Sequence, residues 1–111
     1  MDLIDKCLET SSLVKNDRDI KDVTIKLMEE CGEVAQEISK LGISKYKANK
    51  DEVAFIKSKA VSEASDALNC IVDLVYLLCN KNKEMAKEAL TDFIKLGLEK
   101  WESKYNKDSN I

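Results

Sequence analysis

Apolar residues recur along the chain at the three- and four-residue spacing of amphipathic helices, in four segments separated by short polar breaks. Asn16 and Asp17 mark the first break, and Gly42 is a plausible end for the second segment. Because short connections join amphipathic segments of this length, the pattern predicts an all-α protein built as a four-helix bundle, with a polar tail from about residue 106. The four predicted helices cover residues 2–15, 19–40, 52–80 and 83–105.

The second predicted helix has two distinct faces. Its apolar residues follow one stripe, and its charged residues fall on the opposite side. We expect the apolar stripe to pack on the rest of the bundle and the charged side to face away from it. The stripe consists of Leu27, Cys31, Val34, Ile38 and Leu41, and the charged side of Lys26, Glu30, Glu33, Glu37 and Lys40.

The connection between the second and third predicted helices is basic. Residues 42–59 hold five lysines against Asp51 and Glu52, although residues 51–59 also fit the beginning of the third helix. Two interpretations stay open: a solvated connection, or a mobile basic flap that closes over an anionic ligand. The lysines are Lys45, Lys47, Lys50, Lys57 and Lys59.

Length and charge limit the class of protein. A chain of 111 residues with 44% hydrophobic content fits a single domain over residues 1–111. The net charge of −3 is unlike the strongly basic surface of a nucleic-acid-binding protein, so we expect no nucleic-acid partner. No apolar run approaches the roughly 18 residues that span a bilayer, and the first residues lack the features of a signal peptide. We therefore expect a cytoplasmic protein without a membrane partner.

Two further features of the composition restrict the chemistry. The chain has no histidine, which excludes Ser-His-Asp and Cys-His catalysis and the Glu-x-x-His motifs of di-iron bundles. Its four cysteines form no Cys-x-x-Cys pair and are interpreted as reduced thiols. A reaction carried out by this chain must use carboxylates, lysines, hydroxyls or a bound ion.

Two short acidic motifs stand out, one on the second predicted helix and one on the third. Each holds two carboxylates three residues apart, which project from one helix face about one turn apart. If the two helices lie side by side, four carboxylates converge, and their mutual repulsion calls for cations. An oxygen-only set of ligands suits Mg²⁺, with Mn²⁺ as the other candidate, whereas a solvated helix face is the alternative. The motifs contain Glu30 with Glu33, and Glu63 with Asp66.

Residues 26–38, KLMEECGEVAQEI, and residues 63–68, EASDAL, together resemble the all-α nucleoside triphosphate pyrophosphohydrolases of the MazG type. The pattern of that family is Glu-Glu-x-x-Glu, followed after a spacer by Glu-x-x-Asp. The resemblance covers about residues 20–105. It implies Mg²⁺-dependent cleavage of a nucleoside triphosphate between the α and β phosphates, giving the monophosphate and pyrophosphate. The Mg²⁺ ligands that it implies are Glu30, Glu33, Glu63 and Asp66.

The same resemblance implies roles for three more residues. Glu29 matches the leading acid of the first motif, where it would assist in activating water or simply be exposed. Residues 99–105, EKWESKY, resemble the family's Asn-Lys-apolar-x-x-Arg stretch, so Lys100 and Lys104 would bind phosphate. Glu99 stands where asparagine is common, and Lys104 replaces an arginine, which removes the two-pronged fork of that side chain.

Other candidate residues come from this sequence alone. Gly32, inside a predicted helix, costs about 1 kcal/mol relative to alanine and indicates the close approach of a ligand or a helix. Asp73 lies nearly on the face of Asp66, as an outer ligand, as a hydrogen-bond acceptor behind the ligands, or as a solvated acid. Asn69 interrupts an apolar run, to bind a ribose or base or to bridge two helices. Trp101 stacks on a base or belongs to the core.

The third predicted helix is apolar over a broad arc, more than a thin four-helix core buries, which favours a homodimer or homotetramer. The resemblance likewise implies an oligomer with the site near the protomer interface. Alternatives within the superfamily are a dCTP- or dUTP-selective pyrophosphatase and a phosphoribosyl-ATP pyrophosphohydrolase. The alternative of another class is a non-catalytic helical module that binds a partner.

Overall fold

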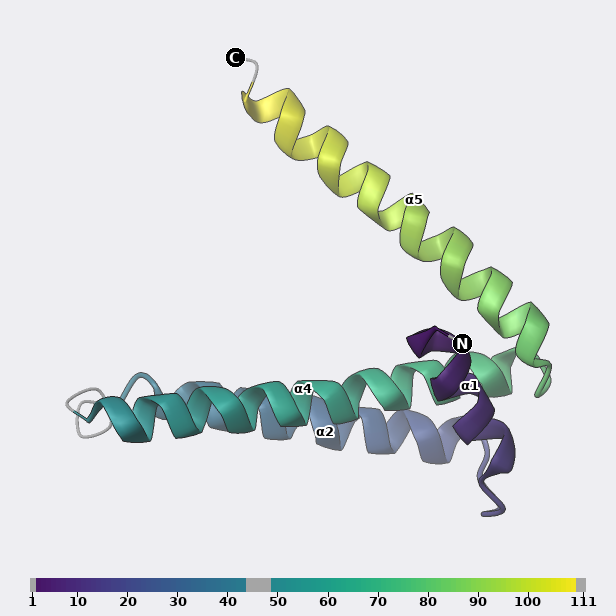
Figure 1. Ribbon diagram of the computed structural model, residues 1–111, viewed down its shortest axis with the longest axis horizontal. Coiled ribbons are helices and arrows are strands. Elements are labelled where there is room, and N and C mark those ends of the chain that lie inside the picture. Colours follow the sequence, from purple (N-terminus) through teal and green to yellow (C-terminus); the bar gives the residue numbers. More distant parts are fainter. Residues whose placement is uncertain (1, 44–48, 110–111) are drawn as a thin grey trace.

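The computed structural model describes residues 2–43 and 49–109, and all the regular structure in those ranges is helical. Figure 1 shows α2 and α4 side by side in opposite directions, with α1 across one end of this pair and α5 leaving from the same end. The prediction of an all-α protein with four helices is confirmed. The helices are α1 (Leu3–Leu13), α2 (Ile20–Lys40), α4 (Lys50–Leu78) and α5 (Lys83–Ser109).

Capping side chains fix where α2 and α4 begin. The backbone N–H of Asp22 donates to Asp19 Oδ1 at 2.8 Å, and the backbone N–H of Asp19 donates to Asp22 Oδ2 at 2.9 Å. This reciprocal capping box starts α2. At the start of α4, the side chain of Asn49 accepts from the backbone N–H groups of Asp51 and Glu52.

The connection between α2 and α4 is shorter than the predicted 42–59. Because α4 begins at Lys50, both Lys57 and Lys59 are helical residues, which confirms the alternative in which residues 51–59 belong to the third helix. Lys45 and Lys47 lie outside the described residues, so the basic flap stays untested.

A tight turn joins α4 to α5. Asn80 and Lys81 have positive φ angles of 56° and 61°, which end α4 in left-handed backbone. The backbone N–H of Lys81 donates to the carbonyl oxygen of Tyr76 at 2.9 Å, and Asn82 then accepts from the N–H of Met85 at the start of α5. The turn brings the start of α5 back against α1 and α4.

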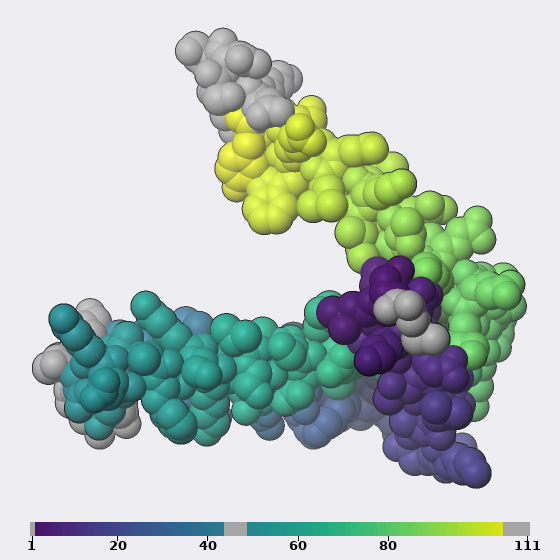
Figure 2. All heavy atoms as spheres, in the orientation of Figure 1, coloured from purple at the N-terminus to yellow at the C-terminus, as the bar shows by residue number. Residues whose placement is uncertain are grey.

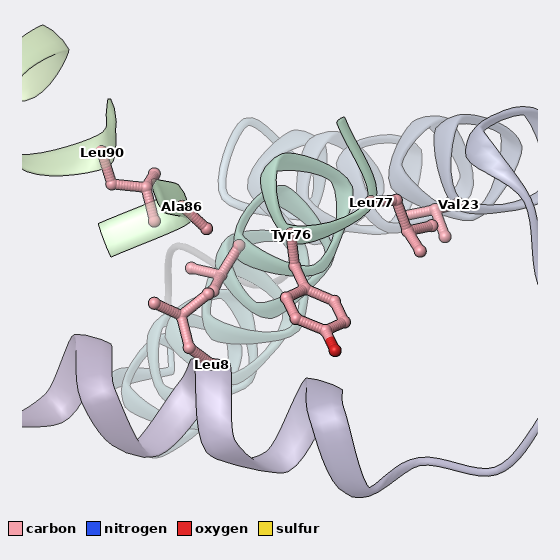
Figure 3. Close-up of a cluster of buried hydrophobic side chains, with 7 residues drawn as sticks. Leu8, Val23, Tyr76, Leu77, Ala86 and Leu90 are labelled. Atoms are coloured by element: carbon pink, nitrogen blue, oxygen red, sulfur yellow. The ribbon is translucent and has the colours of Figure 1, made fainter. Parts of the chain in front are cut away.

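The hydrophobic core lies at this junction (Figure 3). Leu8 of α1 is only 2% exposed, and Ala86 of α5 is fully buried. The small side chain of Ala86 lets α5 begin close to the core. The buried cluster consists of Leu8, Val23, Val72, Tyr76, Leu77, Ala86 and Leu90.

Beyond Leu90, α5 leaves the core. Its apolar stripe begins at the buried Leu90 and continues through exposed side chains, so the assignment of Trp101 to the core is wrong for one chain. The radius of gyration is 17.6 Å, against about 13 Å for a compact domain of this length. Figure 2 shows the open space between α5 and the α2–α4 pair. The exposed part of the stripe is Ile94, Leu98, Trp101 and Tyr105.

Across the described ranges, every helix falls short of the combined length and apolarity that a bilayer crossing requires.

Replacing Leu8 should test this core. We expect Leu8→Ala to lower the free energy of unfolding by about 2–5 kcal/mol, because it leaves a cavity where α1, α4 and α5 meet. Leu3→Ala, on the same helix but at a side chain that is 72% exposed, should change it by less than about 0.5 kcal/mol. Urea unfolding followed by circular dichroism measures both. Equal stability of the two variants would contradict the placement of the core.

Candidate metal centre

The contact between α2 and α4 follows a seven-residue repeat on both helices. Val23, Glu30 and Glu37 of α2 recur at this spacing and are all buried. Such repeats keep one face of each helix against its neighbour, as in a coiled coil. On α4, the repeat consists of Ile56, Glu63, Cys70 and Leu77, with the small residues Ala60 and Ala67 between them.

The faces of α2 differ in part from those predicted. Leu27, Val34 and Leu41 of the apolar stripe are half-buried, but two glutamates of the charged side are buried more deeply. Glu30 and Glu37 are each 6% exposed, whereas Ile38 of the apolar stripe is 50% exposed. The prediction that the charged side of this helix faces away from the bundle was wrong for Glu30 and Glu37, whereas Lys26 and Glu33 are exposed as predicted. The physical reason is that α4 offers small side chains, which leave room for carboxylates, and a lysine that pairs with one of them.

Glu37 is neutralised by two lysines. Its Oε1 atom lies 3.0 Å from Lys40 Nζ and 3.3 Å from Lys59 Nζ. Hydrogen bonding to Lys40, and then to Lys59, lowers the pKa of the Glu37 carboxyl. This end of the contact between α2 and α4 (the seam) therefore needs no other cation.

Glu30, Glu33 and Glu63 form the acid cluster, in which one carboxylate oxygen from each residue lies within 4.8 Å of the others. In the described part of the chain, one lysine contacts this group: Lys26 Nζ lies 3.1 Å from Glu30 Oε1. Three ionised carboxylates against one ammonium leave the acid cluster two positive charges short. A divalent cation would supply that charge.

Glu30 carries an independent sign of a missing partner. Its Oε2 atom is buried and has no hydrogen-bond partner among the described residues. A buried carboxylate oxygen without a donor or a cation is costly, and such atoms are rare in folded proteins. The oxygen-only donors of the acid cluster fit Mg²⁺ or Mn²⁺, which prefer oxygen ligands.

The ionisation of Glu33 responds to the same crowding. A hydrogen bond with Glu63, together with repulsion from Glu30 and Glu63, raises the pKa of Glu33 from 4.5 to about 7. Without a cation, the acid cluster therefore retains a proton near neutral pH. A cation that binds there displaces this proton.

The fourth predicted acid does not join the acid cluster. Asp66 is exposed and lies one turn along α4 from Glu63. Its charge still acts on the Cys70 thiol, whose pKa is raised by burial and then by Glu30, Asp73 and Asp66. Glu29 is also outside the acid cluster, with a side chain that is 60% exposed.

Asp73 is neither a solvated acid nor a free ligand. It holds Arg18 by a two-pronged pair, with Nε donating to Oδ2 at 2.7 Å and Nη2 donating to Oδ1 at 2.6 Å. Sequence reasoning missed this pair. The sequence did hold a sign of it, since Arg18 is the only arginine among 18 basic residues. An arginine can form a planar, two-pronged pair with a carboxylate, which lysine cannot.

Other predicted residues have different positions. A Cβ atom added at Gly32 would meet nothing within 4 Å among the described residues, so no helix of the same chain approaches it closely, and the approach of a ligand stays a prediction. Asn69 bridges α4 and α1, accepting from Cys7 Sγ at 3.6 Å. Lys100 and Lys104 are exposed on the half of α5 that diverges from α2 and α4 (Figure 1). Among the described residues of one chain, neither lysine contacts the acid cluster.

Comparison with protein-family models, with curated proteins and with solved structures finds no match to this chain.

The raised pKa of Glu33 predicts how the stability of the metal-free protein depends on pH. The unfolded carboxyl loses its proton near pH 4.5 and the folded one near pH 7, so the folded state binds more protons in between and stability falls as pH rises through this range. Glu33→Gln removes this fall. In EDTA, we expect its melting temperature to exceed that of the wild type at pH 8 and to match it near pH 4.5.

Glu88→Gln, at an exposed glutamate of α5 outside the acid cluster, serves as the control and should follow the wild type at every pH. Thermal unfolding of the three proteins at several pH values makes the comparison. A constant difference between wild type and Glu33→Gln from pH 4.5 to 8 would contradict the shared proton.

Proposed function

We propose that the protein is a Mg²⁺-dependent nucleoside triphosphate pyrophosphohydrolase, which cleaves a ribo- or deoxyribonucleoside triphosphate between the α and β phosphates. The observation that carries this proposal is the acid cluster, where three carboxylates face one lysine and one buried oxygen lacks a partner. The two motifs that contribute these acids are those that resemble the MazG-type family. Hydrolysis of a phosphoanhydride bond is the chemistry that an oxygen-ligated divalent ion favours.

The proposed reaction is a displacement by water. A water oxygen forms a bond to phosphorus, the phosphoanhydride bond breaks, and the monophosphate and pyrophosphate leave. Mg²⁺ held at the acid cluster would neutralise charge on the phosphates and make water more acidic. Glu30, Glu33 and Glu63 would hold the ion, and Asp66, one turn away on α4, would complete the set on its solvent side. The exposed carboxylate of Glu29 is available to accept the proton from water.

Replacing acid-cluster residues should remove this activity. We expect Glu33→Gln and Glu63→Gln each to lower kcat/KM at least about 100-fold, since even outer partners of metal ligands contribute 10–100-fold. The measurement is release of pyrophosphate and monophosphate from a panel of ribo- and deoxyribonucleotides with Mg²⁺, and EDTA should stop it. The panel includes dCTP, dUTP and phosphoribosyl-ATP, which distinguishes the related specificities.

Glu88→Gln is the matched control and should keep wild-type turnover with an unchanged circular dichroism spectrum. Turnover retained in both acid-cluster variants would refute the metal-ligand roles. A wild type that shows neither turnover nor a Mg²⁺-dependent rise in melting temperature would favour the non-catalytic partner-binding module.

We propose further that the working form contains a second copy of the chain. The apolar stripe of α5 is buried at Leu90 and exposed from Ile94 to Tyr105, and the radius of gyration exceeds that of a compact domain. Exposed stripes of this kind are typical of protein interfaces. Phosphate binding by Lys100 and Lys104 also requires a second copy, because α5 leads away from the acid cluster of its own chain (Figure 1).

Charges placed on the α5 stripe should dissociate the oligomer. We expect the double variant Ile94→Lys, Leu98→Lys to elute as a monomer in size-exclusion chromatography with light scattering, because burying two lysines in an apolar interface is costly. The wild type should have at least twice the chain mass. Ser103→Lys, at an exposed position on the opposite side of α5, should behave as the wild type. A monomeric wild type would contradict the proposed assembly.

A further inference from the structure

A cavity of about 360 Å³ lies between α1 and α4. Polar side chains from both helices and from the connection to α2 line it, including Thr10 of α1 and Asn69 and Asp73 of α4. Its volume is within the range of cavities that hold small-molecule ligands. The metal chemistry proposed above does not use it.

A polar stripe of α4 leads from the acid cluster to this cavity. Asp66, Asn69 and Asp73 recur at three- and four-residue spacing, so they share one face of the helix. At a rise of 1.5 Å per residue, Asn69 lies about 9 Å along α4 from Glu63. A nucleotide held by its phosphates at the acid cluster spans this separation with its sugar and base.

Two of the three charged side chains that line the cavity, Arg18 and Asp73, compensate each other, and the third is the exposed Lys6. Arg18 directs two of its N–H groups to Asp73, and its remaining donors reach Asn16 Oδ1 at 3.0 Å and the carbonyl oxygen of Ser11 at 3.0 Å. The guanidinium is only 11% exposed. Because its donors are already committed, it is not available to a phosphate. The side of the cavity formed by Arg18 and Asp73 therefore suits a neutral polar group.

Two further lining side chains offer hydrogen bonds to such a group. The carbonyl oxygen of the Asn69 side chain accepts from Cys7 Sγ at the long distance of 3.6 Å, which leaves its two amide N–H donors for a ligand. The Thr10 hydroxyl donates to the carbonyl oxygen of Lys6 at 2.9 Å and keeps a lone pair for accepting. Amide and hydroxyl groups complement the edges of nucleobases and the hydroxyls of sugars.

We propose that this cavity binds the nucleoside part of the substrate while the acid cluster holds its phosphates. Asn69 contacts the base or sugar directly, and Thr10 lies across from it on α1. The ion pair of Arg18 and Asp73 lines another side of the cavity. Because its charges compensate each other, it repels neither the sugar nor the base of a neutral nucleoside. This inference rests on the proposed function, because it assigns the second half of the same substrate.

Inorganic tripolyphosphate separates the two halves of the site, because it carries the phosphates without a nucleoside. For Asn69→Ala, we expect KM for the preferred nucleotide to rise about tenfold, the effect of one lost hydrogen bond. The inhibition constant of Mg²⁺-tripolyphosphate should stay within about twofold of the wild type. Thr10→Phe, which fills the cavity from the other helix, should raise the same KM at least as much. Gln36→Ala, at an exposed amide of α2, is the control and should change neither constant.

The outcomes distinguish this inference from the proposed function. An active wild type whose KM is unaffected by both cavity variants overturns the nucleoside subsite and leaves the hydrolase intact. So does a parallel loss of nucleotide and tripolyphosphate binding. A wild type that hydrolyses no nucleotide of the panel overturns both proposals.

Discussion

The seam between α2 and α4 depends on how its buried carboxylates are neutralised. Glu30 and Glu37 occupy equivalent places in the seven-residue repeat and are equally buried, yet their surroundings differ. Glu37 has two lysines, whereas Glu30 shares one lysine with two further glutamates. Burying an uncompensated charge is strongly destabilising. Because lysines neutralise Glu37, the shortage of positive charge is confined to the part of the seam around Glu30. A divalent cation bound there would remove this shortage most directly.

The sequence predicted the helices well because their signals are local. Periodicity located four helices, and the capping box of Asp19 and Asp22 at the start of α2 is likewise a local feature. The spacing of Glu30 with Glu33 correctly placed both on a face that meets Glu63. The burial of Glu30 and Glu37 on α2 was not predicted, because an apolar stripe does not say how far the packed face of a helix extends beyond it. Arg18 and Asp73 are 55 residues apart, so only the folded chain brings them together.

Stability and function are coupled by the way apolar contacts are distributed. The buried cluster lies at the junction of α1, α4 and α5, whereas the buried residues in the middle of the α2–α4 seam are Glu30, Ala60 and Ala67, beside the half-buried Val34. Apolar burial therefore contributes least where the acid cluster lies. A ligand that binds only the folded state stabilises it by mass action. Cation and substrate binding would therefore stabilise the part of the α2–α4 pair that buries the least apolar surface.

The register of α2 on α4 is fixed at the end of this helix pair where α2 begins. Arg18 lies one residue before the capping box that starts α2, and it connects the end of α1 to Asp73 of α4. Because both helices repeat every seven residues, a slide by one repeat would preserve much of the packing and would place Glu30 beside Lys59, where Glu37 now lies. That alternative would neutralise Glu30 and disperse the acid cluster. The two-pronged pair opposes the slide, because it demands one position and one orientation of the guanidinium plane. An arginine at the helix entrance thus sets the geometry of carboxylates several turns away.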